Sequence, residues 1–407
     1  MKLQKISFLL LFILPVVLYF ILFFNNRVNI PSWDDYDIFL SYLNSPEQEQ
    51  LALLFSQHNE HRLVFSKIMA KAMVYCFGFI DFSYLALIGN LMLCALFYLI
   101  YNLFKTYNPY SIYFILPLSY LLFLSPSSEN ITWATGAIQN YSVVFFALFS
   151  FFLFSKNIFL ALICASLASF TSGSGLFIFI ALLLWSLGNI LKKDKNAWRQ
   201  FILISLFSSV IYGSYFYHYI SPIKTYQIQD ILLNPWQTLH YFFIFLGSYV
   251  QDIWISFILG VLSFSFFIYL TITKYFYKNP LIYYFLIFLL INALAAALNR
   301  SVFGPEQALS SRYVIISVLF LLFLYLAILE QITIPPNHYL KVLFSVLFIY
   351  SLLVFKAEYQ ELSIFKQDLI MGVQKWKATG IGLNHPYQAQ AKVQIEQAEK
   401  AGYYYLP

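Results

Sequence analysis

The sequence predicts an all-α polytopic membrane protein, with interfacial helices in its first outer loop and a small C-terminal tail outside the membrane. Of its 407 residues, 61% are hydrophobic and only 10% are charged. Apolar runs of about 18 residues, enough to cross roughly 30 Å of hydrocarbon as a helix, recur along the chain. These runs are continuously apolar rather than alternating, which excludes an outer-membrane β-barrel.

Each apolar run is bounded by polar or charged residues, and eleven runs are predicted to cross the membrane. They cover residues 6–24, 82–104, 110–125, 138–155, 157–171, 174–191, 200–219, 253–273, 280–298, 312–330 and 339–356. The first run lacks a small-residue cleavage site before Arg27, so it is predicted to be an uncleaved span rather than a signal peptide. Cys76, Cys94 and Cys164 lie in apolar surroundings without paired spacing, which indicates neither a disulfide framework nor a metal site.

The distribution of basic residues predicts the orientation of the spans. With a cytoplasmic N-terminus, the inner segments contain most of the basic residues outside the tail and only two acids, Asp194 and Glu330. The inner basic residues are Lys2, Lys5, Lys105, Lys156, Lys192, Lys193, Lys195, Arg199, Lys274, Lys278 and Lys341. This pattern follows the positive-inside rule, so the net charge of +6 reflects membrane orientation rather than binding to nucleic acid.

Two apolar segments are not counted as spans. Residues 63–80 contain Lys67 and Lys71 four positions apart beside an apolar helical face, which is typical of an amphipathic helix at the outer membrane surface. Residues 232–250 are predicted to be interfacial or re-entrant. The chain then divides into a transmembrane domain, residues 1–356, whose first outer loop covers 25–81, and an extracytoplasmic tail, residues 357–407.

Four polar segments are predicted to converge on the outer side, although they are far apart in the sequence. They are residues 25–81, 125–133, 171–175 and 299–313. Segment 171–175 (Thr-Ser-Gly-Ser-Gly) resembles a phosphate-binding loop but lacks its lysine, so a tight turn between two helices is favoured. We expect the functional site where these segments meet.

The acidic pair Asp34 and Asp35 is the predicted catalytic centre. It follows the first span closely and is flanked by Trp33 and Tyr36, which suit the membrane interface. A carboxylate there could take a proton from an acceptor hydroxyl, or bind a divalent cation with its neighbour. Repulsion between adjacent carboxylates raises one pKa, which favours a general base. The alternative is a solvated turn at a helix N-terminus.

His58, Glu60, His61 and Arg62 form a second polar cluster in the same loop. On a helix, His58 and His61 would share a face because they are three positions apart. The cluster is interpreted as a hydrogen-bonding network that positions a phosphate or a sugar. A zinc site lacks a visible third ligand, and the polar side of an interfacial helix is the remaining alternative.

Loop 299–313 supplies the other predicted binding residues, Arg300, Glu306, Arg312 and Tyr313. The planar guanidinium of arginine binds phosphate oxygens with two parallel hydrogen bonds. Gly304 and Pro305 would fold the loop back and bring its two arginines together. The alternative is that each arginine anchors its span at the level of the lipid headgroups.

These features resemble the GT-C superfamily of membrane glycosyltransferases, in which a first span and an acidic outer loop precede further spans. The strings 33–35, 58–62 and 311–313 are similar to a bacterial branch associated with cell-surface polysaccharides. The resemblance implies inverting transfer of a sugar from a polyprenyl-phosphate donor to a glycan or lipid acceptor, outside the bacterial inner membrane. It implies Asp34 as general base and Arg312, with Arg300, as ligands of the leaving phosphate. Relatives often have Asp-Glu where this chain has Asp34-Asp35.

Other functions stay open on the sequence alone. A transporter or flippase usually has ionisable groups near mid-membrane, whereas these spans have little beyond amides such as Asn90 and Asn292. A lipid-linked polysaccharide polymerase or ligase would share the lipid-linked substrate and the outer arginines. A non-catalytic assembly subunit would also have the spans, but point changes in its outer loops would have no effect on function.

Overall fold

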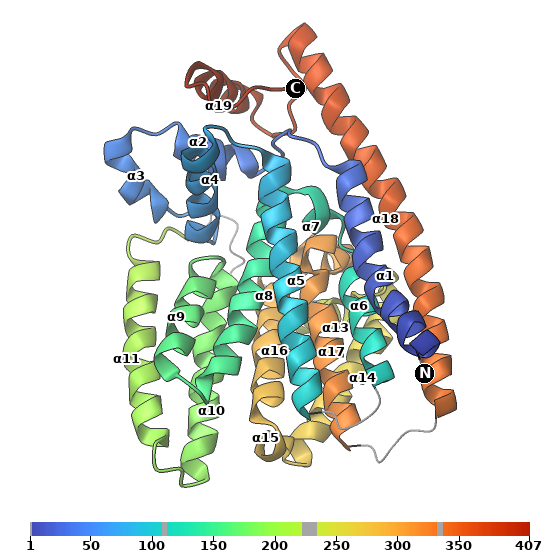
Figure 1. Cartoon of the computed structure of the whole chain (residues 1–407). Helices are drawn as coiled ribbons and strands as arrows, with labels where there is room; N and C mark the ends of the chain where they lie inside the picture. Colours follow the sequence, from blue (N-terminus) through green and yellow to red (C-terminus); the bar gives the residue numbers. More distant parts are fainter. Residues whose placement is uncertain (1, 108–111, 222–233, 332–336) are drawn as a thin grey trace.

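The chain is an all-helical, multi-pass membrane protein. The computed structural model describes residues 2–107, 112–221, 234–331 and 337–407, and no strand occurs within these ranges (Figure 1). The longer helices lie side by side as a bundle. They are α1 (Lys2–Asn26), α5 (Phe82–Tyr107), α8 (Ala134–Phe154), α9 (Ile158–Ser169), α10 (Phe177–Leu191), α11 (Ala197–Phe216), α14 (Ile253–Ile272), α16 (Pro280–Arg300), α17 (Val314–Gln331) and α18 (Asn337–Thr379).

Seven helical segments in the described ranges are long and apolar enough to cross a membrane. They are Phe8–Asn26, Phe82–Thr106, Ala134–Phe154, Gly173–Leu191, Ile253–Ile272, Pro280–Phe303 and Ser311–Gln331. Each coincides with a predicted span. Aromatic side chains fill much of the interior, for example the stacked rings of Phe151 and Trp185, whose centroids lie 6.2 Å apart.

Of the other four predicted spans, three do not form a helix that meets this criterion within the described residues. Run 110–125 contains only the short helix α6 (Leu116–Phe123) after a 3-10 turn at Ile112–Ile115, and residues 110–111 lie outside the described ranges. Helix α9 has 12 residues, which is too short for roughly 30 Å of hydrocarbon at about 1.5 Å per residue. Helix α11 is long enough but is not among the candidate spans, because Arg199 and Gln200 in its first turn, together with its serines and tyrosines, lower its hydropathy.

The last predicted span is part of a longer helix. Helix α18 has 43 residues, so the predicted boundary between the transmembrane domain and the tail, at residue 356, falls inside a continuous helix. Figure 1 shows α18 beside α1 and rising past the ends of the other long helices. After α18 the chain turns back and forms α19 (Gln388–Lys400) above the first outer loop.

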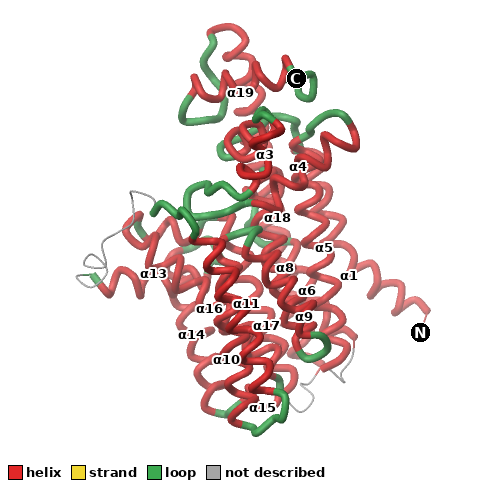
Figure 2. Tube along the Cα trace, turned by 90° about the vertical axis from the view of Figure 1, so that its left-hand side faces the viewer, coloured by secondary structure: helices red, strands yellow, loops and turns green. Residues whose placement is uncertain are grey.

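The two ends of the bundle differ in character (Figure 2). One end carries the turns between α10 and α11 and around α15 (Tyr275–Lys278), where predicted inner lysines lie. The other end, called here the loop-rich end, carries most of the short helical elements. These are the π-helical turn Tyr36–Leu40, α2 (Ser41–Leu43), α3 (Glu47–Leu54), α4 (Val64–Phe77), α7 (Ser128–Thr132), α19 and the 3-10 turns Gly173–Leu176, Ser301–Phe303, Pro305–Leu309 and Ser311–Tyr313.

Helix α4 (Val64–Phe77) occupies the segment predicted as an amphipathic surface helix, but one of its two lysines does not face solvent. Lys67 is buried, with only 3% of its surface exposed. Its ammonium group donates hydrogen bonds to the carbonyl oxygen of Leu53 and the hydroxyl of Ser56, both at 2.8 Å. The carbonyl groups in the last turn of α3 lack partners within the helix, and the ammonium group of Lys67 donates to one of them. The lysine therefore joins α4 to α3 instead of facing solvent.

Helix α13 (Pro235–Gly247) occupies the second ambiguous segment, of which residues 232–233 lie outside the described ranges. Near its start, the hydroxyl of Thr238 lies 3.3 Å from that of Ser301, just after α16. Beyond its end, the backbone N–H of Tyr249 donates to Ser317 in the first turn of α17. Both neighbours belong to the loop-rich end, so α13 stays at that end and does not cross. This agrees with an interfacial or re-entrant segment.

The crossing of α5 and α8 gives a stability prediction. A Cβ atom at Gly89 would lie 2.3 Å from the carbonyl carbon of Ala137, whereas one at Gly213 in α11 would have nothing within 4 Å. Gly89→Ala is therefore expected to destabilise the fold by about 1–3 kcal/mol or more through overpacking. Gly213→Ala, the matched control, should gain up to about 1 kcal/mol in helix propensity. Melting temperatures in detergent test this, and equal values for the two variants would contradict the close packing.

Candidate functional site

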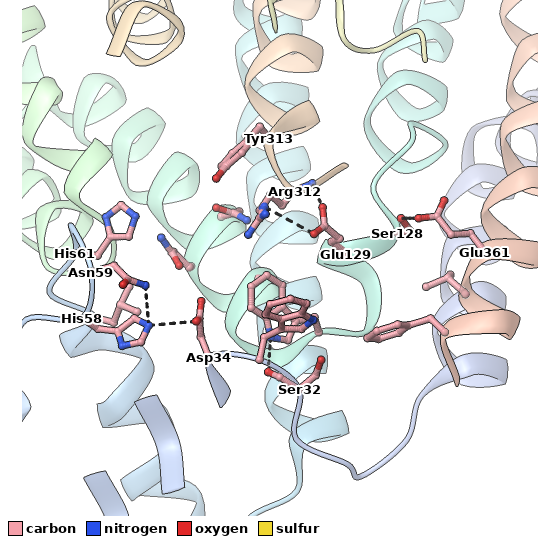
Figure 3. A pocket seen from close by; sticks show the side chains of 18 of the residues that line it. Ser32, Asp34, His58, Asn59, His61, Ser128, Glu129, Arg312, Tyr313 and Glu361 are labelled. Carbon is pink, nitrogen blue, oxygen red and sulfur yellow. Dashed lines mark hydrogen bonds and ion pairs between the residues drawn. The ribbon is translucent and has the colours of Figure 1, made fainter. Parts of the chain in front are cut away.

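A cavity of about 640 Å³, called here the polar cavity, opens at the loop-rich end (Figure 3). Its walls come from the first outer loop, from segments 125–140 and 300–313, and from α18. The lining residues are Ser32, Trp33, Asp34, His58, Asn59, Glu60, His61, Leu63, Ser128, Glu129, Trp133, Gly136, Gln139, Asn140, Arg300, Arg312, Tyr313, Glu361, Leu362, Ile364, Phe365 and Asp368.

The predicted convergence of four polar segments is confirmed by direct contacts. The side chain of Arg300 donates to Glu60 at 2.7 Å. The backbone N–H of Gly173 donates to Nδ1 of His61 at 3.1 Å. The hydroxyl of Ser311 donates to Glu129 at 2.9 Å. Segments 25–81, 125–133, 171–175 and 299–313 therefore meet in one place.

Asp34 faces the polar cavity. Its Oδ1 atom lies 3.3 Å from Nε2 of His58 (Figure 3). Burial by itself would raise the pKa of Asp34, but the hydrogen bond and charge of His58, together with Arg312 and His61, outweigh it and lower the pKa below its ordinary value. Asp34 is thus an ionised carboxylate held at the wall of the cavity.

Asp35 points away from the cavity and holds the start of α8. Its carboxylate accepts hydrogen bonds from the backbone N–H and hydroxyl of Thr135, at 3.0 and 2.6 Å, and from the N–H of Ser32 at 3.0 Å. Burial outweighs these bonds and raises the pKa of Asp35 to about 7. The prediction that both carboxylates are catalytic needs correction, because Asp35 is buried among structural partners and lines neither cavity.

His58 and His61 flank a tight turn rather than sharing a helical face, which corrects the sequence interpretation. Their backbone groups exchange two hydrogen bonds of 2.8 and 2.9 Å, and Asn59 in the turn has a left-handed φ of 49°. Asparagine tolerates this conformation better than most residues. The turn sends His58 toward Asp34, while His61 accepts the hydrogen bond from Gly173.

The neighbouring group of His61, Glu60 and Arg300 is a compact charge network. Nε2 of His61 lies 3.8 Å from Oε1 of Glu60, the same oxygen that binds Arg300. Burial lowers the pKa of His61. Burial alone would raise the pKa of Glu60, but His61 and Arg300 lower it on balance. Glu60 is therefore an anion that partly neutralises Arg300.

Arg62, predicted to bind substrate, is a structural residue. Its guanidinium donates to three backbone carbonyl groups: that of Tyr215 at 2.6 Å, that of Tyr217 at 2.5 Å, and that of Phe55. Carbonyl groups at the end of α11 lack partners within the helix, and a buried arginine satisfies them. Arg62 thereby joins loop 25–81 to α11, and it is absent from the lining of the polar cavity but present in that of the second cavity described below.

The arginines of loop 299–313 converge, as predicted from the fold-back at Gly304 and Pro305. The guanidinium carbons of Arg300 and Arg312 lie 5.2 and 5.3 Å from the ring centre of Tyr313. Nε of Arg312 contacts Ser310 at 3.2 Å and lies 3.7 Å from Glu129. Its two terminal nitrogens have no hydrogen-bond partner among the described residues. Glu306, in contrast, is exposed and lines neither cavity, so its predicted binding role has no geometric support.

Glu129 and a face of α18 are among the lining residues that were not predicted as site residues. Glu129 accepts hydrogen bonds at one carboxylate oxygen from the hydroxyls of Ser310 and Ser311 and from the backbone N–H of Arg312, at 2.9–3.1 Å. It thereby fixes the loop that carries Arg312. Helix α18 contributes Glu361, Phe365 and their neighbours, and the helical spacing of 361, 365 and 368 is the only sequence indication of a shared face.

A second cavity of about 1580 Å³, called here the apolar cavity, adjoins the first. The two share Asn59, Glu60, His61, Gln139, Asn140, Arg300, Arg312 and Tyr313. Much of the remaining wall is apolar and comes from segment 174–180 and from α11, α16 and α17, with Ile180, Phe216, Ala296 and Ile316 among its residues. The shared polar residues lie where charged and apolar surroundings meet.

Within the described ranges, no group of three or more His, Cys, Asp or Glu side chains is arranged to hold a metal ion. Comparison with protein-family models, curated proteins and solved structures finds no match to this chain. Function is therefore inferred from the geometry of the two cavities.

Proposed function

We propose that this protein is a membrane glycosyltransferase that uses a polyprenyl-phosphate sugar donor and works on the extracytoplasmic face of the bacterial inner membrane. The observation that carries the proposal is the junction of the two cavities. An apolar cavity at the helix ends suits a hydrocarbon chain, and the adjoining polar cavity suits a sugar. Arg300 and Arg312 line both, where the phosphate of such a donor would lie.

The proposed reaction is an in-line displacement at the anomeric carbon. The acceptor hydroxyl oxygen forms the new bond to that carbon and gives its proton to the carboxylate of Asp34. The bond between carbon and phosphate oxygen breaks, and the phosphate leaves with the electron pair. The terminal nitrogens of Arg312 would stabilise this charge, and the anomeric configuration would invert. His58 keeps Asp34 ionised and able to take a proton, although its lowered pKa makes Asp34 a weaker base than the raised pKa expected for an adjacent carboxylate pair.

The test is product formation by the purified protein in lipid nanodiscs. Polyprenyl-phosphate hexoses and pentoses are supplied with a mixture of cell-envelope glycans and lipids, and products are identified by mass spectrometry. Sugar transfer to an acceptor, with release of polyprenyl phosphate, is expected. Movement of intact donor between leaflets without bond cleavage would instead favour a flippase. Failure of every donor to be consumed would contradict the proposal.

The pH dependence of transfer tests the pair formed by Asp34 and His58. Burial raises the pKa of Asp34, and the hydrogen bond and charge of His58 are the two strongest influences that oppose it. Removal of His58 should therefore raise the pKa of Asp34. In His58→Ala the acid limb of the rate profile is expected to move to higher pH. His385→Ala removes a similar partner from Asp37, which lies 3.4 Å away, and should leave the limb in place. Coincident limbs for wild type and His58→Ala would contradict the pairing.

The proposed orientation is tested by labelling from outside the cell. In a background without native cysteines, cysteine is placed at the exposed positions Glu306, Glu396 and Lys193. The positive-inside rule predicts that an impermeant maleimide modifies the first two and spares the third. Modification of all three positions, or of 193 alone, would reverse or refute the orientation.

A further inference from the structure

The polar cavity has two sides, and only one adjoins the apolar cavity. The residues shared by the cavities, including His61, Arg300 and Arg312, form the first side. The second side, which includes Ser128 and Glu361, lines the polar cavity alone, and in Figure 3 Asp34 and Arg312 both lie between His61 and this pair. In an in-line displacement the acceptor hydroxyl contacts the base and attacks the anomeric carbon from the face opposite the phosphate, so the second side is open to an acceptor.

Helix α18 forms much of this second side. Its residues Glu361, Leu362, Ile364, Phe365 and Asp368, called here the α18 wall, line the polar cavity and are absent from the apolar one. Glu361 accepts a hydrogen bond from Ser128 at 2.7 Å. The wall contains two carboxylates and an aromatic ring but no lysine or arginine, so it offers acceptors for hydroxyl or ammonium groups and an apolar surface.

Trp33 provides a second apolar surface in the same cavity. It is 54% exposed and adopts a left-handed φ of 49°, which is uncommon for a residue other than glycine. The C-terminal segment holds Trp33 in this conformation. The backbone N–H of Trp33 donates to the backbone carbonyl of Asn384 at 2.8 Å, and the side-chain amide of Asn384 donates to the hydroxyl of Ser32 at 2.8 Å. An exposed indole maintained in an unusual conformation indicates use in binding.

We infer that the α18 wall and Trp33 bind the acceptor and select a neutral or amine-bearing sugar over one that carries a carboxylate or phosphate. This rests on the proposed transferase function. The indole would stack on the C–H face of a sugar ring, and the two carboxylates would accept hydrogen bonds from its hydroxyl or ammonium groups. An anionic acceptor would instead meet the three carboxyl groups of Asp34, Glu361 and Asp368.

The experiment measures binding of three trisaccharides to the full-length protein in nanodiscs by saturation-transfer NMR titration. Maltotriose is neutral, the glucosamine trimer is cationic and trigalacturonate is anionic. The first two are expected to bind about tenfold more tightly than the third, the scale of a close like-charge repulsion. Glu361→Gln combined with Asp368→Asn should largely abolish this preference, and Trp33→Ala should weaken maltotriose binding about tenfold.

Glu396→Gln is the matched control, since Glu396 lies on α19 outside the cavity and pairs with Lys392. It should not change the preference, and melting temperatures confirm that each variant is folded. Equal affinity for all three sugars, no binding of any, or an unchanged preference in the double variant would overturn the inference. Sugar transfer is measured in parallel. A binding preference among the trisaccharides without transfer would contradict the proposed function. Transfer without that preference would contradict acceptor selection by the α18 wall.

Discussion

Replacement of Asp34 by asparagine is expected to lower the rate of sugar transfer by about 10²–10⁴-fold, the usual contribution of a general base. The variant keeps the size and hydrogen-bonding capacity of the side chain but removes the proton acceptor. Donor affinity should be nearly unchanged, because the shared arginines rather than Asp34 face the apolar cavity. Initial rates and donor binding are measured with the same nanodisc preparation.

Asp35→Asn is the matched control, with the same chemical change one residue along the chain. Asp35 accepts two hydrogen bonds from Thr135 at the start of α8 and one from Ser32, so its replacement is expected to cost about 1–3 kcal/mol of stability while the chemical step is spared. Its melting temperature should fall, while the transfer rate of the folded fraction is largely kept. Near-normal turnover by Asp34→Asn would refute the assignment, and a larger rate loss in Asp35→Asn would move the base to that residue.

Loss of Arg312 should have the second largest effect. Arg312→Ala is expected to reduce transfer by about 10²–10³-fold. This is the usual effect of removing a hydrogen-bond donor that stabilises negative charge developing in a transition state. Arg312→Lys should recover only part of this loss, because an ammonium group cannot form two parallel hydrogen bonds to phosphate. Folding should be little affected, since Glu129 still accepts bonds from Ser310, Ser311 and the backbone at 312.

Arg27→Ala serves as the control for Arg312. Arg27 follows α1, lies 5.2 Å from the ring centre of Phe24 and lines neither cavity, as expected of an interfacial anchor. Its loss should leave transfer and donor affinity unchanged. Wild-type activity in Arg312→Lys, or equal losses in Arg312→Ala and Arg27→Ala, would reduce Arg312 to a similar anchor.

The sequence anticipated where polar residues meet but not what each of them does. The acidic pair illustrates the difference, because Asp34 and Asp35 are adjacent and chemically alike. Their separation depends on Thr135, one hundred residues away, whose backbone and hydroxyl bind Asp35 and leave Asp34 to the cavity. The histidines show the same limit: a spacing of three suggests a helix, but the turn at Asn59 directs His58 and His61 to different partners.

The sequence by itself determined that the chain is helical and multi-pass, because hydrocarbon requires continuous apolar helices and that requirement is local. It also indicated the segments that hold the site, since charges are costly in the membrane and gather outside it. Only the tertiary structure decided that Asp35, Arg62 and Lys67 are structural, and that α18 continues past residue 356 to line the polar cavity. The physical reason is that contacts between distant segments determine which side chains are buried and which hydrogen-bond partners they find. The local pattern and the residue type do not reveal these contacts.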